Sequence, residues 1–351
     1  MQGSYEKALS AERVEEGEGV SRIICGDALT ELKKLPDESV HCCVTSPPYW
    51  GLRDYGVPGQ IGLETTPEAY VEKMVDVFAE VRRVLRADGT LWLNLGDSYW
   101  GGKGMNGNTK ARTTAEERGF VQSGGTPQGP WRPQDGIHEV LKPKDLVGIP
   151  WRVAFALQAS GWYLRQDIIW SKPNPMPESV TDRCTKAHEY IFLLSKSARY
   201  FYDNEAVKEP YMREWNENNG GNLAPVGFHK RNDGFSERGG NYPLPKTGAN
   251  RRSVWTISTK PFSEAHFATF PPEIPEICIK AGCPPHGIVL DPFGGAGTVG
   301  LVAEKLGREY LLIELNPSYV EMAERRISID CGELLKWTDR QPAAQENGVL
   351  I

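Results

Sequence analysis

The sequence predicts an α/β fold in which helices cover a mostly parallel sheet, and three observations lead to this prediction. Short apolar runs that end in Gly, Asp or Pro recur along the chain. Longer segments with the apolar spacing of helices that bury one face separate these runs. Residues 287–316 contain such a unit without interruption, as a strand, a tight glycine turn, a helix and a second strand. This alternation is typical of parallel strands covered by helices.

Seven strands are predicted, each followed by a turn. They cover Arg22–Cys25, Val40–Thr45, Thr90–Leu95, Asp167–Trp170, Tyr190–Leu194, Ile288–Leu290 and Tyr310–Ile313. Helices are predicted over 67–86, 145–159, 272–282, 298–306 and 317–328 from the spacing of their apolar residues. Pro67 suits the first turn of its helix, and Asn316 followed by Pro317 is a typical helix start.

Two long stretches, 101–140 and 204–250, are rich in Gly, Asn, Pro and Arg and show little periodicity. We therefore expect insertions or loops there, inside one large domain over 21–329. An acidic tail over 1–20 and a C-terminal tail over 330–351 flank that domain and carry −5 of the net charge of −6. A chain of 351 residues would also accommodate two domains.

The distribution of charge permits a nucleic-acid partner but does not require one. The loop-rich stretches lean basic, with seven Lys and Arg against five acids over 101–149 and eight against six over 204–252. A solvated loop of mixed charge is the alternative interpretation of the same counts.

Cysteine usage and hydropathy indicate a protein of a reducing cytoplasm. The seven cysteines include the adjacent Cys42 and Cys43 and form no spaced disulfide framework. No signal-like segment opens the chain, and no apolar run approaches the ~18 residues that a membrane span needs. Cys278, Cys283 and His286 lie close together, but three ligands without a second pair are too few for structural zinc, so no metal is expected.

The segment D-P-F-G-G-A-G-T, which begins at Asp291, indicates a nucleoside cofactor site. Gly294, Gly295 and Gly297 let the backbone turn sharply and approach a ligand, because no Cβ stands in the way. At the end of the next strand, Glu314 can accept hydrogen bonds from a ribose diol. A glycine turn needed only for helix–sheet packing is the alternative.

The carboxylate of Asp291 helps to identify the nucleoside cofactor that binds. The N-terminus of a helix after a glycine loop can hold a pyrophosphate. A carboxylate directly before the loop would repel phosphates but could hold an ammonium group. S-adenosyl-L-methionine has a cationic amino-acid end and no phosphate, so it is the cofactor that we expect.

A second motif, Ser46-Pro47-Pro48-Tyr49, follows a predicted strand and fits chemistry at an amine. An exocyclic amine of a nucleobase is a poor nucleophile because its lone pair is delocalised into the ring. Acceptors that bind both of its N–H groups free that pair for attack on a methyl sulfonium. The Ser46 hydroxyl oxygen and the Pro47 carbonyl would be these acceptors, since two prolines fix the backbone and remove competing donors. Tyr49 would stack on a base that has left the duplex.

Taken alone, the two prolines could simply end a strand or form a short polyproline piece. Both motifs, however, follow parallel strands, and open α/β sheets bind ligands at the carboxyl ends of their strands. The two motifs are therefore expected to meet at one edge of the sheet.

Together, T-S-P-P-Y-W-G-L-R-D-Y-G and D-P-F-G-G-A-G-T resemble the catalytic and cofactor motifs of the amino-methylating DNA methyltransferases, in the order of their β group. The resemblance extends to 26–40, 186–203 and 255–274 and leaves out only the ends and the two insertions. It implies that Ser46, Pro47, Pro48 and Tyr49 form the catalytic turn. It implies that S-adenosyl-L-methionine is contacted by Asp27, Phe267, Thr269, Phe270, Asp291, Phe293, Gly294, Gly295, Gly297, Thr298 and Glu314.

The resemblance also explains the order of the motifs. In most methyltransferases the strand before the glycine loop comes first, whereas here it comes near the end of the chain. The resemblance therefore implies a circularly permuted, Rossmann-like sheet of the class I SAM-dependent methyltransferases, with the strand before Asp27 beside the strand before Glu314. Seven strands are expected, one of them antiparallel, with helices on both faces.

The resemblance implies a target amine in double-stranded DNA, and two amines remain open. In the family, Ser at the first motif position goes mostly with cytosine N4 and Asp with adenine N6, so Ser46 favours cytosine N4. Methylation at cytosine C5 needs a cysteine nucleophile after a proline, and no proline precedes any of the seven cysteines. A methyltransferase acting on RNA or protein is the more distant alternative, and a nicotinamide dehydrogenase would not need the Ser46 turn.

Recognition of a DNA sequence is expected in the 204–250 insertion, because Arg and Asn can read base edges. The 101–140 stretch is the second choice, as a loop that closes over DNA. Candidate DNA contacts are Arg53, Arg213, Lys230, Arg231 and Arg238, although Arg53 could instead pair with Asp54. A second copy of the chain and a cognate restriction endonuclease are further partners to consider, in the cytoplasm of a bacterial, archaeal or phage-infected cell.

Two further residues near the motifs have more than one interpretation. Asp97, at the end of a predicted strand, either lines the pocket or caps a turn. His188 is expected as a hydrogen-bonded core histidine, with a place near the site as the alternative.

Overall fold

The computed structural model describes residues 21–52, 54–101, 138–210, 248–259 and 270–338. Within these residues, eight strands form one sheet in the order β1-β8-β7-β2-β3-β5-β4-β6. Strand β5 runs antiparallel to β3 and β4, and the other neighbouring pairs are parallel. The strands are β1 (Arg22–Cys25), β2 (Val40–Thr45), β3 (Leu85–Leu95), β4 (Tyr163–Ser171), β5 (His188–Ser195), β6 (Val254–Thr256), β7 (Ile288–Asp291) and β8 (Glu309–Glu314).

The seven expected strands and the single antiparallel strand are confirmed, and an eighth strand was not predicted. That strand, β6, has only three residues and pairs with β4 at the edge of the sheet, so it is too short to show periodicity. β3 begins at Leu85 rather than Thr90, because the exposed residues Arg86–Asp88 interrupt its apolar pattern.

The five predicted helices are present, and a sixth, α1, was not predicted because its five residues are too few to show helical spacing. α2 begins as expected at Pro67, where the Thr66 hydroxyl accepts from the Ala69 amide at 3.2 Å. α7 continues to Thr338 rather than ending at residue 328, so it crosses the boundary placed at residue 330. The helices within the described residues are α1 (Ala28–Leu32), α2 (Pro67–Val84), α4 (Ile149–Ala159), α5 (Glu273–Gly282), α6 (Thr298–Lys305) and α7 (Pro317–Thr338).

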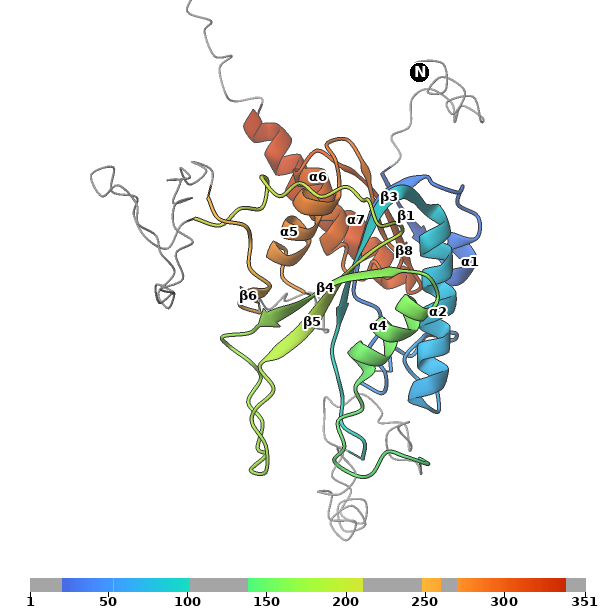
Figure 1. The fold of residues 1–351 in the computed structure, drawn as a ribbon. Coiled ribbons are helices and arrows are strands. Elements are labelled where there is room, and N and C mark those ends of the chain that lie inside the picture. The colour runs from blue at the N-terminus through green and yellow to red at the C-terminus, as the bar shows by residue number, and fades with distance from the viewer. Residues whose placement is uncertain (1–20, 53, 102–137, 211–247, 260–269, 339–351) are drawn as a thin grey trace, which may run out of the picture.

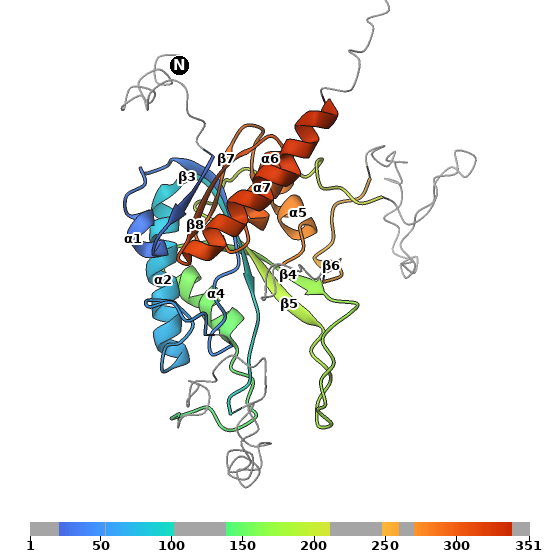
Figure 2. The same cartoon turned by 180° about the vertical axis from the view of Figure 1, so that it is seen from behind.

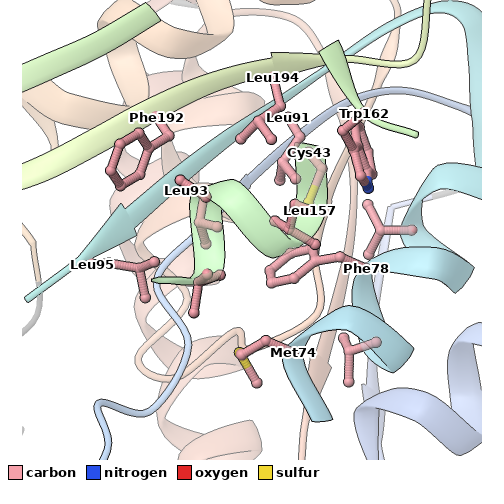
Figure 3. Close-up of a cluster of buried hydrophobic side chains, with 14 of the residues drawn as sticks. Cys43, Met74, Phe78, Leu91, Leu93, Leu95, Leu157, Trp162, Phe192 and Leu194 are labelled. Carbon is pink, nitrogen blue, oxygen red and sulfur yellow. The ribbon is translucent and has the colours of Figure 1, made fainter. Parts of the chain in front are cut away.

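Helices cover both faces of the sheet (Figures 1 and 2). α1, α2 and α4 pack on one face, and α5, α6 and α7 pack on the other, each over its own apolar core. Under α2 and α4, Met74, Phe78 and Leu157 pack on Leu91 and Leu93 of β3 (Figure 3). Each such side chain contributes about 1.5–3 kcal/mol by burial, so the two cores fix the sheet that carries the site. None of the described helices combines the length and the apolar character needed to cross a membrane.

The strand order joins segments from opposite ends of the sequence. β1 pairs with β8, and the Gly26 amide donates to the Glu314 carbonyl at 2.9 Å. β2 lies between β7 and β3. The parallel strands β1, β8, β7 and β2 therefore end at one edge of the sheet. The expected docking of the strand before Asp27 against the strand before Glu314 is confirmed.

Candidate active site

The turn after β2 is fixed by α2 and by the segment that follows it. The Tyr70 hydroxyl donates to the Pro48 carbonyl at 2.9 Å. Trp50 is buried, and its Nε1 donates to the Glu64 carbonyl at 2.9 Å. No donor of the described residues reaches the Pro47 carbonyl, so this oxygen stays available as an acceptor.

Ser46, Tyr49, Asn94 and Glu189 form one hydrogen-bonded network beside this turn. Tyr49 Oη donates to Glu189 Oε2 at 2.7 Å and lies 3.0 Å from Asn94 Oδ1. Asn94 Nδ2 donates to Glu189 Oε2 at 3.3 Å and to the Tyr190 carbonyl at 3.1 Å, so its Oδ1 faces the hydroxyls. Ser46 Oγ lies 3.3 Å from Asn94 Oδ1 and 3.4 Å from Tyr49 Oη. Because the one proton of Ser46 points to these oxygens, its lone pairs remain acceptors.

Gly96, just after β3, makes room for the Tyr49 ring. A Cβ at position 96 would lie 2.5 Å from Tyr49 Cε2 and 2.8 Å from Cδ2. Burial of the hydroxyl, with the charge of Glu189 beside it, raises the pKa of Tyr49 well above its usual range. The phenol therefore stays protonated and donates to Glu189.

Glu189 also forms an ion pair with Lys172, just beyond the end of β4, and both side chains are mostly buried, with 16% and 18% exposed. Lys172 Nζ lies 4.3 Å from the centre of the Trp170 ring. Lys186 is close enough for the Glu189 charge to act on its ammonium group, which donates to the Asp97 carbonyl at 3.1 Å. Glu189 reaches the site because the antiparallel β5 begins where β3 ends.

A hydrogen bond joins the two motifs, since Thr45 Oγ1 donates to Asp291 Oδ1 at 2.6 Å across neighbouring strands. Asp291 is 2% exposed and also accepts from the Phe293 amide at 3.0 Å. Burial raises the pKa of Asp291 to about 7, although both hydrogen bonds oppose this rise. No cationic side chain of the described residues pairs with Asp291. A ligand cation would therefore meet an acid that has no counter-charge from that part of the chain.

The glycine loop lies against the end of β8. The Gly294 amide donates to the Ile313 carbonyl at 2.8 Å, and the Gly295 amide donates to Glu314 Oε2 at 2.8 Å. Gly297 begins α6 with a φ of 72°, and a Cβ there would lie 2.8 Å from Ala323 Cβ. Only glycine fits this position without strain, because the backbone is left-handed and α7 packs closely on it.

Two more acids lie at the same edge of the sheet. Glu314 Oε1 accepts from the Asn316 amide at 2.8 Å, and burial raises the pKa of Glu314. Each carboxylate oxygen has a second lone pair that a ligand hydroxyl could use. On the neighbouring β1 side, Asp27 begins α1 and accepts from the Thr30 amide at 2.9 Å. A buried acid, a glycine cradle and an acid next to it fit a nucleoside with a cationic tail.

The described candidate residues therefore gather at one edge. Ser46, Pro47, Pro48 and Tyr49 follow β2, the glycine loop from Asp291 to Thr298 follows β7, and Asp27 and Glu314 lie at the ends of β1 and β8. Phe270 is partly buried against the apolar core under α5 and α6. The candidates Arg53, Arg213, Lys230, Arg231, Arg238, Phe267 and Thr269 lie outside the described residues.

Sequence reasoning missed Thr45, Asn94, Gly96, Lys172 and Glu189. The sequence carried a signal for two of them, because Asn94 is a polar residue inside the apolar run of β3 and Glu189 is an acid near the start of the apolar run of β5. In the structure Asn94 is 3% exposed. The others show their roles only through their neighbours in the folded chain.

The structure separates the two interpretations of Asp97. Its Oδ1 accepts from the Gly148 and Ile149 amides at 2.9 and 3.0 Å, so it caps the start of α4. The His188 ring packs edge-on against Tyr190, with 5.3 Å between ring centres, and is partly buried.

Residues 40–325 match the family model N6_N4_Mtase, described as DNA methylase. Among curated proteins, the chain is similar to the type II methyltransferases M.XycI of Xanthomonas campestris pv. cyanopsidis and M.Cfr9I of Citrobacter freundii. M.XycI is 49% identical over 308 residues, which are 88% of this chain and 87% of the relative. M.Cfr9I is 48% identical over 303 residues, which are 86% of each chain.

Solved structures show the same fold. The PvuII DNA methyltransferase (cytosine-N4-specific) aligns with a TM-score of 0.55 at 20% identity, covering 90% of this chain and 92% of its own. A Thermus thermophilus protein complexed with S-adenosyl-L-methionine aligns with a TM-score of 0.53 at 22% identity, covering 89% of this chain and 94% of its own. The permuted, Rossmann-like α/β sheet is therefore confirmed as that of class I SAM-dependent DNA methyltransferases.

Proposed function

The chain belongs to the N6/N4 DNA methylase family, and from that premise we propose that it methylates the N4 amine of a cytosine flipped out of duplex DNA. At the level of the family, it is a type II DNA methyltransferase that uses S-adenosyl-L-methionine. The choice of amine and the roles of the residues depend on the geometry of the site.

The hydrogen bond between Thr45 and Asp291 is the observation that carries the proposal. It ties the residue before Ser46 to the first residue of the glycine loop at 2.6 Å. A base amine at the Ser46 turn would therefore sit next to a methyl donor held at the loop. Positioning of this kind is a large part of the catalysis of methyl transfer, since the reacting atoms must meet in line.

The Ser46 turn offers the acceptors that an amine nucleophile needs. Ser46 Oγ and the Pro47 carbonyl would accept hydrogen bonds from the two N–H groups, which favours a tetrahedral nitrogen with a free lone pair. The Pro48 carbonyl is already engaged by Tyr70, which leaves the Pro47 carbonyl as the acceptor. The Tyr49 ring, fixed through its hydroxyl, would stack on the flipped base.

Different residues would bind different parts of the cofactor. When bound, S-adenosyl-L-methionine supplies a methyl group on a sulfonium. Asp291 would hold its ammonium end, Glu314 would bind the ribose diol, and Asp27 would lie near the adenine. Phe293, Gly294, Gly295, Gly297 and Thr298 would line the cradle, as would Phe267, Thr269 and Phe270 on the methionine side.

Ser46 supports cytosine N4 over adenine N6. A serine hydroxyl is a weaker acceptor than a carboxylate, and members of the family with Ser at this position act mostly on cytosine. The same two contacts would also serve adenine N6, so the choice of base needs its own measurement.

We propose duplex DNA as the substrate, with base contacts from the 204–250 insertion and phosphate contacts from basic residues. The candidates for these contacts are Arg53, Arg213, Lys230, Arg231 and Arg238. The type II relatives support a cognate restriction endonuclease as a partner in the cytoplasm of the cell. A dimer of the chain is a further proposal, which sedimentation would test.

The test is incubation with duplex DNA and labelled S-adenosyl-L-methionine, followed by mass analysis of the nucleosides. We expect N4-methylcytosine, and a rate at least about 100-fold lower for Ser46→Ala with cofactor affinity unchanged. Ser39→Ala is the matched control, because the Ser39 hydroxyl donates to the Pro36 carbonyl at 2.8 Å, away from the site. N6-methyladenine as the product would overturn the choice of base, and a normal rate for Ser46→Ala would overturn the acceptor role.

A further inference from the structure

A chain of oxygen atoms leads from the Ser46 turn to a carboxylate that the proposed function does not use. Ser46 Oγ lies 3.4 Å from Tyr49 Oη, and Tyr49 Oη donates to Glu189 Oε2 at 2.7 Å. The first contact is longer than a usual hydroxyl pair, and such contacts tighten when substrate binds. The second contact is already short and has a carboxylate as its acceptor.

An acceptor for a proton is required by the chemistry of an amine. When the amine nitrogen takes up a methyl group it gains a positive charge, and it becomes neutral only by losing a proton. Ser46 cannot keep that proton unless it gives up its own, because a hydroxyl with two protons is strongly acidic. Among the described residues, Tyr49 is the only group that both contacts the Ser46 hydroxyl and donates its own O–H to an acid.

Tyr49 is suited to pass a proton on rather than to hold a charge. Burial and the neighbouring Glu189 charge raise its pKa, so the phenolate is disfavoured. Tyr49 can therefore accept a proton from Ser46 only as it gives its own to Glu189.

The surroundings of Glu189 suit a carboxylate at the end of such a chain. Lys172 from the end of β4 forms an ion pair with it, and Lys186 from the segment before β5 lies near. Tyr49 and Asn94 donate to Glu189 Oε2 from the other side. The Glu189 side chain is 16% exposed, so solvent water can reach it.

We propose that Glu189 is a positioning residue that orients Tyr49 and receives the amine proton through Tyr49 and Ser46. This inference rests on the proposed function, since it needs an amine bound at Ser46. It gives a role to an acid of the 186–203 segment that the proposed function leaves without one.

In the proposed step, methyl transfer to the amine is coupled to the loss of one amine proton. The amine nitrogen forms a bond to the methyl carbon while the carbon–sulfur bond breaks, and the electron pair of that bond stays on sulfur. One amine proton passes to Ser46 Oγ, the Ser46 proton passes to Tyr49 Oη, and the Tyr49 proton passes to Glu189 Oε2. A neutral methylated amine, a neutral thioether and a protonated Glu189 result, and water later takes the proton.

A purely structural role for Glu189 is the competing explanation, and one substitution separates the two. Glu189→Gln keeps an oxygen that can accept from Tyr49, so orientation is retained, but an amide cannot take up the proton. Glu189→Ala removes both. A proton-accepting role predicts that Gln loses nearly as much rate as Ala, whereas a role limited to orienting Tyr49 predicts that Gln keeps the rate of the wild type.

The experiment measures methyl transfer to duplex DNA in a single turnover with enzyme in excess. We expect Glu189→Gln to be slower by about 100-fold or more, with unchanged affinity for cofactor and DNA. The melting temperature should fall because Lys172 loses its ion-pair partner, so the rates are compared well below the melting temperature of the variant. Tyr49→Phe should lose a similar factor, and the double variant Tyr49→Phe/Glu189→Gln should be no slower than Tyr49→Phe, because both act through one chain. Glu276→Gln is the matched control, since Glu276 pairs with Lys280 at 2.6 Å on α5, away from the site.

The outcomes distinguish this inference from the proposed function. If the wild type methylates a DNA amine and Glu189→Gln does so at the same rate, the proton route is wrong while the function stands. If the losses of the two single variants multiply in the double variant, Glu189 does not act through Tyr49. If the wild type leaves DNA amines unmethylated, the proposed function fails first.

Discussion

Asp291 provides a direct test of the electrostatics of the site, because it is a buried acid that no cationic side chain of the described residues pairs with. Its pKa rises from an ordinary value of 3.8 to about 7 through burial. Between these two values the unfolded chain has released the proton while the folded chain still holds it. Unfolding therefore releases a proton, and the free energy of unfolding falls as the pH rises through this window.

The pKa shift of Asp291 sets the size of its effect on the free energy of unfolding. Each pH unit of pKa shift corresponds to 1.36 kcal/mol, so a rise of about three units costs the folded protein about 4 kcal/mol once the pH exceeds about 7. Below 3.8 both states hold the proton and the cost disappears. Asp291→Asn removes this pH dependence. Its amide oxygen can still accept from Thr45 and from the Phe293 amide, while its NH₂ group adds a penalty of about 1–3 kcal/mol that does not vary with pH.

The assay is urea unfolding of the cofactor-free protein and of Asp291→Asn at a series of pH values between about 4 and 8. We expect the wild type to lose stability relative to the variant as the pH rises, by up to about 4 kcal/mol over the window. Calorimetry should also show that binding of S-adenosyl-L-methionine near pH 7 releases more protons from the wild type than from the variant. Parallel stability curves for the two proteins would refute the reasoning, because the difference between them would then contain no titration of Asp291.

Two further predictions concern glycines of the site. Gly96→Ala places a Cβ 2.5 Å from the Tyr49 ring, so we expect it to destabilise the protein by about 1–3 kcal/mol in urea unfolding and to slow methyl transfer. In the Tyr49→Ala background the same change should cost almost nothing, and an equal cost there would show that the ring is not the obstacle. Gly297→Ala combines a left-handed φ of 72° with a contact of 2.8 Å to Ala323, so we expect a loss of about 1–3 kcal/mol and weaker cofactor binding by calorimetry. Unchanged stability in Gly297→Ala would mean that α7 moves away without cost.

The sheet could be predicted because its central strands are buried on both faces. β2 and β7 are short, almost wholly apolar runs that end in residues typical of turns, and their bounds in the structure are within one residue of the prediction. β6 and α1 were missed because neither is long enough for a periodic pattern. The start of β3 was missed because it lies at an exposed end, where tertiary pairing with Val40 holds residues that have no apolar pattern.

Residues of the candidate site could be predicted where they follow the end of a parallel strand. They could not be predicted where their place depends on the direction in which a strand pairs. Ser46 and Glu314 were predictable because they lie at the ends of parallel strands, and those ends always share an edge. Glu189 lies near the beginning of a strand, which in a parallel sheet would place it at the opposite edge. Only the antiparallel pairing of β5 with β3, in which Tyr190 faces Leu95, brings it to the active edge. An apolar run does not give the direction of a strand, so the contact of Glu189 with Tyr49 could not be derived from its position in the sequence.

The site is assembled by sheet order, and chain order matters little to it. Thr45 and Asp291 are 246 positions apart along the chain, yet their strands are neighbours, and Thr45 Oγ1 donates to Asp291 Oδ1 at 2.6 Å. On the other side of β2, β3 contributes Asn94 and then β5 contributes Glu189, both bonded to Tyr49. The Ser46 turn therefore lies between a cofactor half built on β7, β8 and β1 and an amine-binding half built on β3, β5 and β4. Any permutation of the chain that preserves this neighbour order would preserve the chemistry, because the contacts that define the site join strands that are adjacent or, for Tyr49 and Glu189, separated by β3 alone.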